Sequence, residues 1–198
     1  DGHFEAIEER SEITRLGKGV DLTKTLSPEA LETTLKVLTR FAQEARDLGA
    51  LGIVTTATSA ARDANNGKVF LDGAKARAGL EVEILSGEEE ARLSFASAFS
   101  DFGGRSQLVV VDIGGGSTEF IYGGLLGELI YRRSFDVGSV RLTERYMRTD
   151  PPSGAELAEI DALLTKTFSA LPAAPPAFRM VGVAGTVTTL CAVAHRVE

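Results

Sequence analysis

Apolar positions recur along this chain with two periods, one typical of helices and one typical of strands. Residues 28–48 show the helical period, and Ser27-Pro28 places a capping hydroxyl and a first-turn proline before them. The pattern predicts further helices over 68–79, from Ser86 to a stop at 101–104, over 139–147, over 155–171 and from Thr186 onward. Strands are predicted over 4–20 with a turn at its end, 51–57, 80–85, 107–113, 117–123, 128–136 and from Arg179 to the glycines that follow.

The order of these elements indicates the fold class. Helices and strands alternate through the first part of the chain, as α/β packing requires. The three strands between residues 107 and 136 follow one another directly, which predicts an antiparallel meander. The helix and glycine turn at 86–104 lie between these two parts, so we expect an α/β protein with two structural halves.

Composition narrows the class of protein further. The chain has 198 residues, of which 43% are hydrophobic and 25% charged, and its net charge is −7. This charge argues against a general nucleic-acid surface, because neutralising phosphates takes clustered lysine and arginine. No apolar run approaches the ~20 residues of a membrane span, and Cys191 is the single cysteine, which excludes an intramolecular disulfide. These features predict a cytoplasmic protein that binds neither nucleic acid nor membrane.

The segment VVVDIGGGSTEF at 109–120 joins an apolar strand to an acid and three glycines. It has neither the G-x-G-x-x-G spacing of a dinucleotide fold nor the spacing of a P-loop, so both are excluded. A glycine turn can bring backbone N–H groups close to a phosphate, and the flanking acids suit a metal ion. The alternative is a glycine-rich hairpin with a solvated acid. The residues concerned are Asp112, Gly114, Gly115, Gly116, Ser117 and Glu119.

Three other segments carry groups suited to phosphate chemistry. Gly185-Thr186 lies where a strand meets a helix N-terminus, which can bind an anion or can simply be a strand-to-helix turn. Arg62 follows a strand and either binds phosphate through its guanidinium or pairs with an acid. One of the three glutamates at 88–90 could face a cleft and activate water, whereas the alternative is a solvated acidic helix start.

Five motifs in order resemble the exopolyphosphatase / guanosine pentaphosphate phosphohydrolase family: TATSAARDANN, LEVEILSGEEEARLSF, VVVDIGGGSTEF, SFDVGSVRLTERY and VGVAGTVTTL. The resemblance covers about residues 10–190. It implies two ribonuclease-H-like domains of the actin-like ATPase superfamily with a cleft between them, here expected at 1–92 and 93–198. Family members use Mg²⁺ and water to remove a terminal phosphate from inorganic polyphosphate or guanosine pentaphosphate.

The resemblance also implies roles for individual residues. Glu90 matches the proposed catalytic base, and Arg62 matches an arginine that contacts phosphate. Asp112 and Glu119 match two acids near the metal. Gly114–Ser117 matches the phosphate loop, and Gly185-Thr186 matches a second loop that faces the cleft.

One family motif is absent from this sequence. Family members begin with a D-x-G-[ST]-N-S type segment, so both domains are expected to be truncated here, and hydrolysis is predicted for the full-length protein. A non-catalytic sensor of alarmones or polyphosphate is the alternative, and an ATP-dependent kinase is a third hypothesis. Related proteins commonly dimerise, so a homodimer is one expectation.

Overall fold

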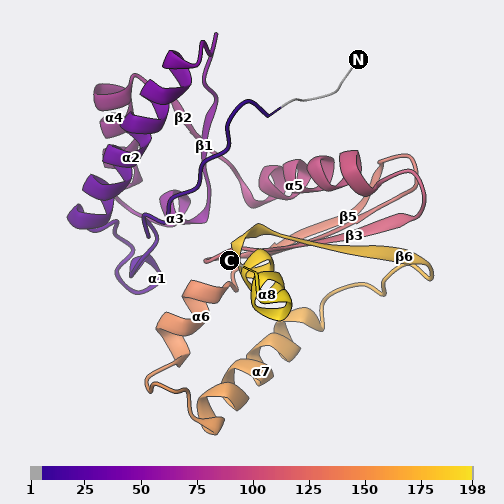
Figure 1. Ribbon diagram of the computed structural model, residues 1–198. Helices are drawn as coiled ribbons and strands as arrows, with labels where there is room; N and C mark the ends of the chain where they lie inside the picture. Colours follow the sequence, from indigo (N-terminus) through magenta and orange to yellow (C-terminus); the bar gives the residue numbers. More distant parts are fainter. Residues whose placement is uncertain (1–5, 198) are drawn as a thin grey trace.

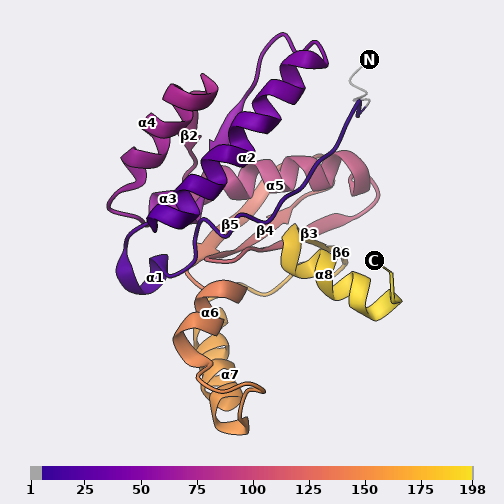
Figure 2. The same cartoon turned by 60° about the vertical axis from the view of Figure 1, so that its left-hand side comes forward.

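The structure is a computed structural model that describes residues 6–197. It contains two sheets flanked by helices, shown from two directions in Figures 1 and 2. Strands β1 (Thr55–Ala57) and β2 (Val82–Ile84) form a parallel pair, and a second sheet has four strands in the order β5-β4-β3-β6. None of the helices in the described part of the chain is long and apolar enough to cross a membrane. The predicted α/β class is confirmed.

Four helices accompany the two-stranded sheet, and local capping sets the bounds of the longer two. The predicted helix at 28–48 is α2 (Pro28–Asp47), whose N-cap hydroxyl, on Ser27, accepts a hydrogen bond from Ala30 N at 3.1 Å. The predicted helix at 68–79 is α4 (Gly67–Ala78), which ends because Gly79 takes the left-handed conformation, with φ of 65°. The short helices are α1 (Val20–Thr23) and α3 (Ser59–Arg62).

The four-stranded sheet contains the predicted meander. Strands β3 (Gln107–Ile113), β4 (Thr118–Gly123) and β5 (Leu129–Phe135) pair antiparallel, and β6 (Phe178–Val183) pairs parallel with β3. Helix α5 (Gly87–Phe102) covers one face (Figure 1). On the other face Phe168, the last residue of α7 (Gly154–Phe168), packs against Phe120 and Phe135. The face under α5 is apolar, with a core of Ala91, Phe95, Ala98, Leu108, Val110 and Ile121. The remaining helices are α6 (Ser139–Tyr146) and α8 (Ala184–His195).

Two strand predictions in the first half of the chain are wrong in extent. The strand predicted over 4–20 does not form in its described part, 6–20: residues 6–19 run without regular structure into a turn, and Val20 begins α1. Residues 4–5 lie outside the described residues. The strand predicted over 51–57 is reduced to β1, and Leu51 and Val54 are 105% and 91% exposed. A strand needs a hydrogen-bonding neighbour, and among the described residues β1 and β2 pair only with each other over three positions.

Ala184 begins α8 with φ of 69°, a left-handed conformation in which the Cβ of an L-residue is crowded. We expect Ala184→Gly to raise the free energy of unfolding by about 0.5–1 kcal/mol, because the relieved crowding exceeds the backbone entropy that glycine costs. The matched control is Ala76→Gly on the exposed side of α4, which should lower it by about 1 kcal/mol. Chemical denaturation measures both, and an equal loss in the two variants would contradict strain at Ala184.

Candidate functional site

The β3–β4 hairpin sets two carboxylates opposite each other. Asp112 and Glu119 are direct partners in the antiparallel register, so their side chains lie on one face, the face that carries Val110 and is covered by α5. Ser94 Oγ of α5 donates to Asp112 Oδ2 at 2.5 Å, and Ser134 Oγ of β5 donates to Glu119 Oε1 at 2.6 Å. The hairpin therefore joins two acids and two hydroxyls under the first turns of one helix.

The three glutamates at the start of α5 have three different surroundings. Glu89 completes a capping box with Ser86, and its Oε2 accepts from Ser86 N at 2.9 Å. Glu88 is 73% exposed and accepts a hydrogen bond from Arg132 at 3.0 Å. Glu90 alone is half-buried and turned toward the acids of the hairpin. The interpretation of the whole run as a solvated face is thus wrong for Glu90.

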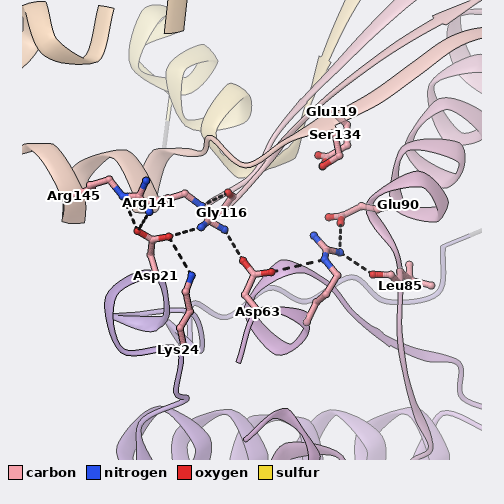
Figure 3. Close-up of polar contacts among 11 residues, drawn as sticks. Asp21, Lys24, Asp63, Leu85, Glu90, Gly116, Glu119, Ser134, Arg141 and Arg145 are labelled. Atoms are coloured by element: carbon pink, nitrogen blue, oxygen red, sulfur yellow. Dashed lines mark hydrogen bonds and ion pairs between the residues drawn. The ribbon is translucent and has the colours of Figure 1, made fainter. Parts of the chain in front are cut away.

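Arg62, the last residue of α3, contacts residues at the start of α5 and just before it. Its Nη1 donates to the carbonyl of Leu85 at 2.8 Å and lies 3.5 Å from Glu90 Oε2 (Figure 3). Its Nε lies 4.0 Å from Asp63 Oδ1. Both expectations for this side chain are therefore compatible: Arg62 does pair with acids, and the side chain, which is 27% exposed, lies beside the residue that matches the catalytic base.

Burial makes Glu119 and Glu90 unusual acids. Glu119 is 1% exposed, and its Oε2 has no hydrogen-bond partner among the described residues. Burial raises the pKa of Glu119, the Ser134 hydroxyl opposes this, and the nearby carboxylates of Glu90 and Asp112 add to it, so that the pKa is about 7. Burial also raises the pKa of Glu90 above its ordinary value, Asp112 adds to this, and Arg62 opposes it. The site therefore concentrates negative charge where water screens it poorly.

The glycine turn exposes its backbone amides on one side. The carbonyls of Gly114, Gly115 and Gly116 all accept hydrogen bonds from residues at the start of α6, whereas the amides of Gly115, Gly116 and Ser117 donate to no other group among the described residues. None of the three glycines has a positive φ. Close approach explains them instead, because a Cβ on Gly116 would lie 2.8 Å from Ser59 Oγ. The turn provides adjacent unpaired donors of the kind that bind phosphate.

The second predicted phosphate loop lies against the first through a chain of hydroxyls. Thr186 Oγ1, in the first turn of α8, donates to Ser139 Oγ at 3.1 Å. Ser139 N in turn donates to the carbonyl of Gly114 at 3.0 Å. A Cβ on Gly185 would meet no atom within 4 Å, so this residue faces open space. The structure therefore brings the N-termini of α6 and α8 to the glycine turn.

A cavity of about 620 Å³ adjoins the turn on the side of α1 and α3. It reaches Gly115 and Gly116, but Glu90, Asp112 and Glu119 do not line it, so the cavity and the acidic site meet only at the turn. Its polar and charged lining consists of Arg15, Lys18, Asp21, Ser59, Asp63, Ser139, Arg141, Thr143 and Glu144.

Sequence reasoning missed several residues that shape this site. Arg141 of α6 donates to Gly116 O and forms ion pairs with Asp21 and Asp63 (Figure 3). Arg141 lies within the SFDVGSVRLTERY motif, which marked the segment but not the residue. Ser94 follows Glu90 by four positions, so helical spacing could have placed it on the same face. Nothing in the local sequence indicates Asp21 as a partner of Arg141.

The acids of the hairpin fit a Mg²⁺ ion that keeps most of its waters. Among residues 6–197 no three His, Cys, Asp or Glu side chains are grouped closely enough to hold a metal by themselves. Mg²⁺ usually binds through one or two carboxylates together with waters and substrate phosphates, so a complete protein cage is not required. Glu119 Oε2, buried and without a partner, and its cross-strand neighbour Asp112 supply oxygens of this kind.

The fold and the glycine turn with its free amides are typical of a phosphatase. The chain belongs to the Ppx/GppA phosphatase family, because a model of that family matches residues 1–197. Exopolyphosphatase 2 of Mycobacterium tuberculosis is 40% identical over 98% of this chain, and the chain spans 63% of that relative's length. A crystal structure of the Aquifex aeolicus family member superposes with a TM-score of 0.77 at 32% identity, covering 100% of this chain and 63% of that one. An exopolyphosphatase from Cytophaga hutchinsonii has a TM-score of 0.80 at 26% identity, over 91% and 60%. The resemblance is confirmed.

Replacing Glu119 with glutamine should change how stability depends on pH. Because the pKa of Glu119 is near 7 in the folded chain and ordinary in the unfolded chain, the wild type loses stability as pH rises from about 4.5 through 7. Glu119→Gln removes this loss, so without metal it should be more stable at pH 8, by up to about 3 kcal/mol, and nearly equal at pH 4.

The measurement is urea denaturation with EDTA at several pH values. The control is Glu88→Gln, which removes an exposed carboxylate and should shift stability by less than about 1 kcal/mol at each pH. Parallel stability curves for wild type and Glu119→Gln would contradict the raised pKa.

Proposed function

We propose that the full-length protein containing this chain is an exopolyphosphatase, which removes the terminal phosphate of inorganic polyphosphate by attack of water. The observation that carries the proposal is the adjacency of two features: a turn with three amides that have no partner among the described residues, and a half-buried Glu90 beside the buried Glu119 and its half-buried cross-strand partner Asp112. The name of the M. tuberculosis relative supports polyphosphate as the substrate.

The chemistry divides between binding and proton transfer. The amides of the Gly114–Ser117 turn, the Gly185-Thr186 amides and the Arg62 guanidinium would bind oxygens of the terminal phosphoryl group. Glu90 would accept a proton from a water whose oxygen forms a bond to the terminal phosphorus. The bond from that phosphorus to the bridging oxygen then breaks, and the shortened polyphosphate leaves with its oxygen negatively charged. A base with a raised pKa holds such a proton more readily at neutral pH.

Asp112 and Glu119 would hold the Mg²⁺ ion of the proposed site. When bound, the ion supplies positive charge that offsets the charge of the phosphates. Because Glu119 is buried next to other carboxylates, its ionised form gains most from a cation at that point. Ser94 and Ser134 orient the two acids from α5 and β5 through the hydrogen bonds already described.

Several finer expectations remain predictions. Guanosine pentaphosphate presents the same terminal group as polyphosphate and is a second candidate substrate. A cytoplasmic location, a homodimer, a surface that does not bind nucleic acid, and a division into domains at 1–92 and 93–198 stay as predicted from the sequence. A non-catalytic sensor is not favoured, because the residue matching the base is present and lies half-buried beside Arg62 and Asp112.

Glu90→Gln in the full-length protein should lower the rate of phosphate release from polyphosphate by about 10²–10⁴-fold, because glutamine cannot accept the proton. The change in KM should be small, since Glu90 is not proposed to bind substrate. Phosphate release with Mg²⁺ measures both, and EDTA should abolish it.

Glu88→Gln provides the matched control, because this neighbouring carboxylate is exposed and paired with Arg132. Its rate should stay within about twofold of the wild type. Equal activity of Glu90→Gln and wild type would rule out Glu90 as the base, and an inactive wild type would rule out the phosphatase.

A further inference from the structure

We propose that Arg141 is a positioning residue, which holds the Gly114–Ser117 turn so that its amides face a bound phosphate and which connects this turn to Arg62 and Glu90 through Asp63. The inference rests on the proposed function, because it concerns the loop that would bind the terminal phosphate. Three observations support it: the hydrogen bonds to the turn, the ion pairs across the two halves, and the burial of the guanidinium.

The hydrogen bonds determine where the amides of the turn point. Arg141 N donates to Gly115 O at 2.9 Å, and Arg141 Nε donates to Gly116 O at 2.7 Å. In a trans peptide the carbonyl and the following N–H point in opposite directions. Holding these two carbonyls toward α6 therefore directs the amides of Gly116 and Ser117 away from α6, where they have no partner among the described residues.

The remaining nitrogens of the guanidinium bind acids from the first half of the chain. Nη1 pairs with Asp21 of α1, and Nη2 lies 2.6 Å from Asp63 Oδ2. Arg141 is 10% exposed, so water screens its charge poorly and the two carboxylates are needed to compensate it. The same side chain that orients the turn thus attaches the turn to two residues that precede Arg141 by 78 and 120 positions.

The ion pairs continue from Asp63 to the proposed base. Asp63 Oδ1 lies 4.0 Å from Arg62 Nε, and Arg62 Nη1 lies 3.5 Å from Glu90 Oε2. These contacts form one series of alternating charges from Arg141 to Glu90, and Figure 3 labels its members Arg141, Asp63 and Glu90. Displacing Arg141 should therefore disturb the phosphate loop first and Arg62 second.

Arginine is required at this position because its donors lie in a fixed planar fork. Three nitrogens of Arg141 serve three different acceptors, whereas a lysine has one nitrogen to offer. Arg145, one helical turn further along α6, provides a matched control. It also pairs with Asp21, with Nη2 at 2.7 Å, but it makes no hydrogen bond to the turn and is 46% exposed.

The test compares Arg141→Met, Arg141→Lys and Arg145→Met in the full-length protein, with phosphate release from polyphosphate measured under Mg²⁺. We expect Arg141→Met to raise KM at least tenfold, Arg141→Lys to restore part of this loss, and Arg145→Met to keep KM within twofold. A purely structural role would reduce the active fraction, and hence the apparent kcat, without changing KM. An unchanged KM in Arg141→Met, with kcat lowered or not, would overturn the inference.

A second measurement covers the case in which Arg141→Met does not fold. Asp63→Asn keeps the shape of the side chain but removes its charge, and it should raise KM at least threefold if Asp63 holds Arg141 and Arg62 in place. Titration with inorganic phosphate, followed by NMR, should shift the amide signals of Gly116 and Ser117 in the wild type and less in Asp63→Asn.

These outcomes separate the inference from the proposed function. Unchanged KM and equal NMR shifts in Asp63→Asn would overturn the inference while leaving an active wild type as a phosphatase. A wild type that releases no phosphate would overturn the proposed function itself, whatever the variants do.

Discussion

The pairing register of β3 with β4 is the constraint on which the site depends. It places Asp112 opposite Glu119 on the face that α5 covers, so two like charges share a poorly hydrated space. Among residues 6–197 no lysine or arginine lies at hydrogen-bond distance from either acid, and each acid accepts a hydrogen bond from one serine hydroxyl. Such an arrangement costs stability in the absence of a cation, which is typical of a site organised for binding rather than for folding.

Helix α5 positions Glu90, the proposed base, next to the paired strands β3 and β4. Its capping box sets where it starts, its apolar face packs Ala91 and Phe95 onto the sheet, and these two facts orient Glu90 toward the hairpin. Arg62 reaches the same point from α3 and is anchored on the carbonyl of Leu85, just before the helix. The proposed base and its arginine therefore come from different elements that meet at one helix N-terminus.

The glycines of the turn illustrate how a correct motif can have a different physical cause. The sequence suggested that they free the backbone to approach phosphate. In the structure their φ angles are ordinary, and what they permit is close contact with Ser59 and with Val140 at the start of α6. Packing on one side of the turn leaves its amides without partners among the described residues on the other side. The absence of Cβ atoms therefore permits both the close packing and the free amides.

Local patterns in the sequence were enough to determine α2, α4, α5 and the β3–β4–β5 meander, because capping residues, glycine stops and side-chain periods act within a few positions of one another. The motifs likewise identified the family and Glu90 as the residue that matches its base. Only the tertiary structure decided that the 6–19 segment forms no strand, that Glu88 and Glu89 face elsewhere, and that Arg141 binds Asp21 and Asp63. These outcomes depend on which distant groups meet when the two sheets pack. A side-chain pattern with a period of two or 3.6 residues carries no information about pairs of residues that are separated by 78 or 120 positions.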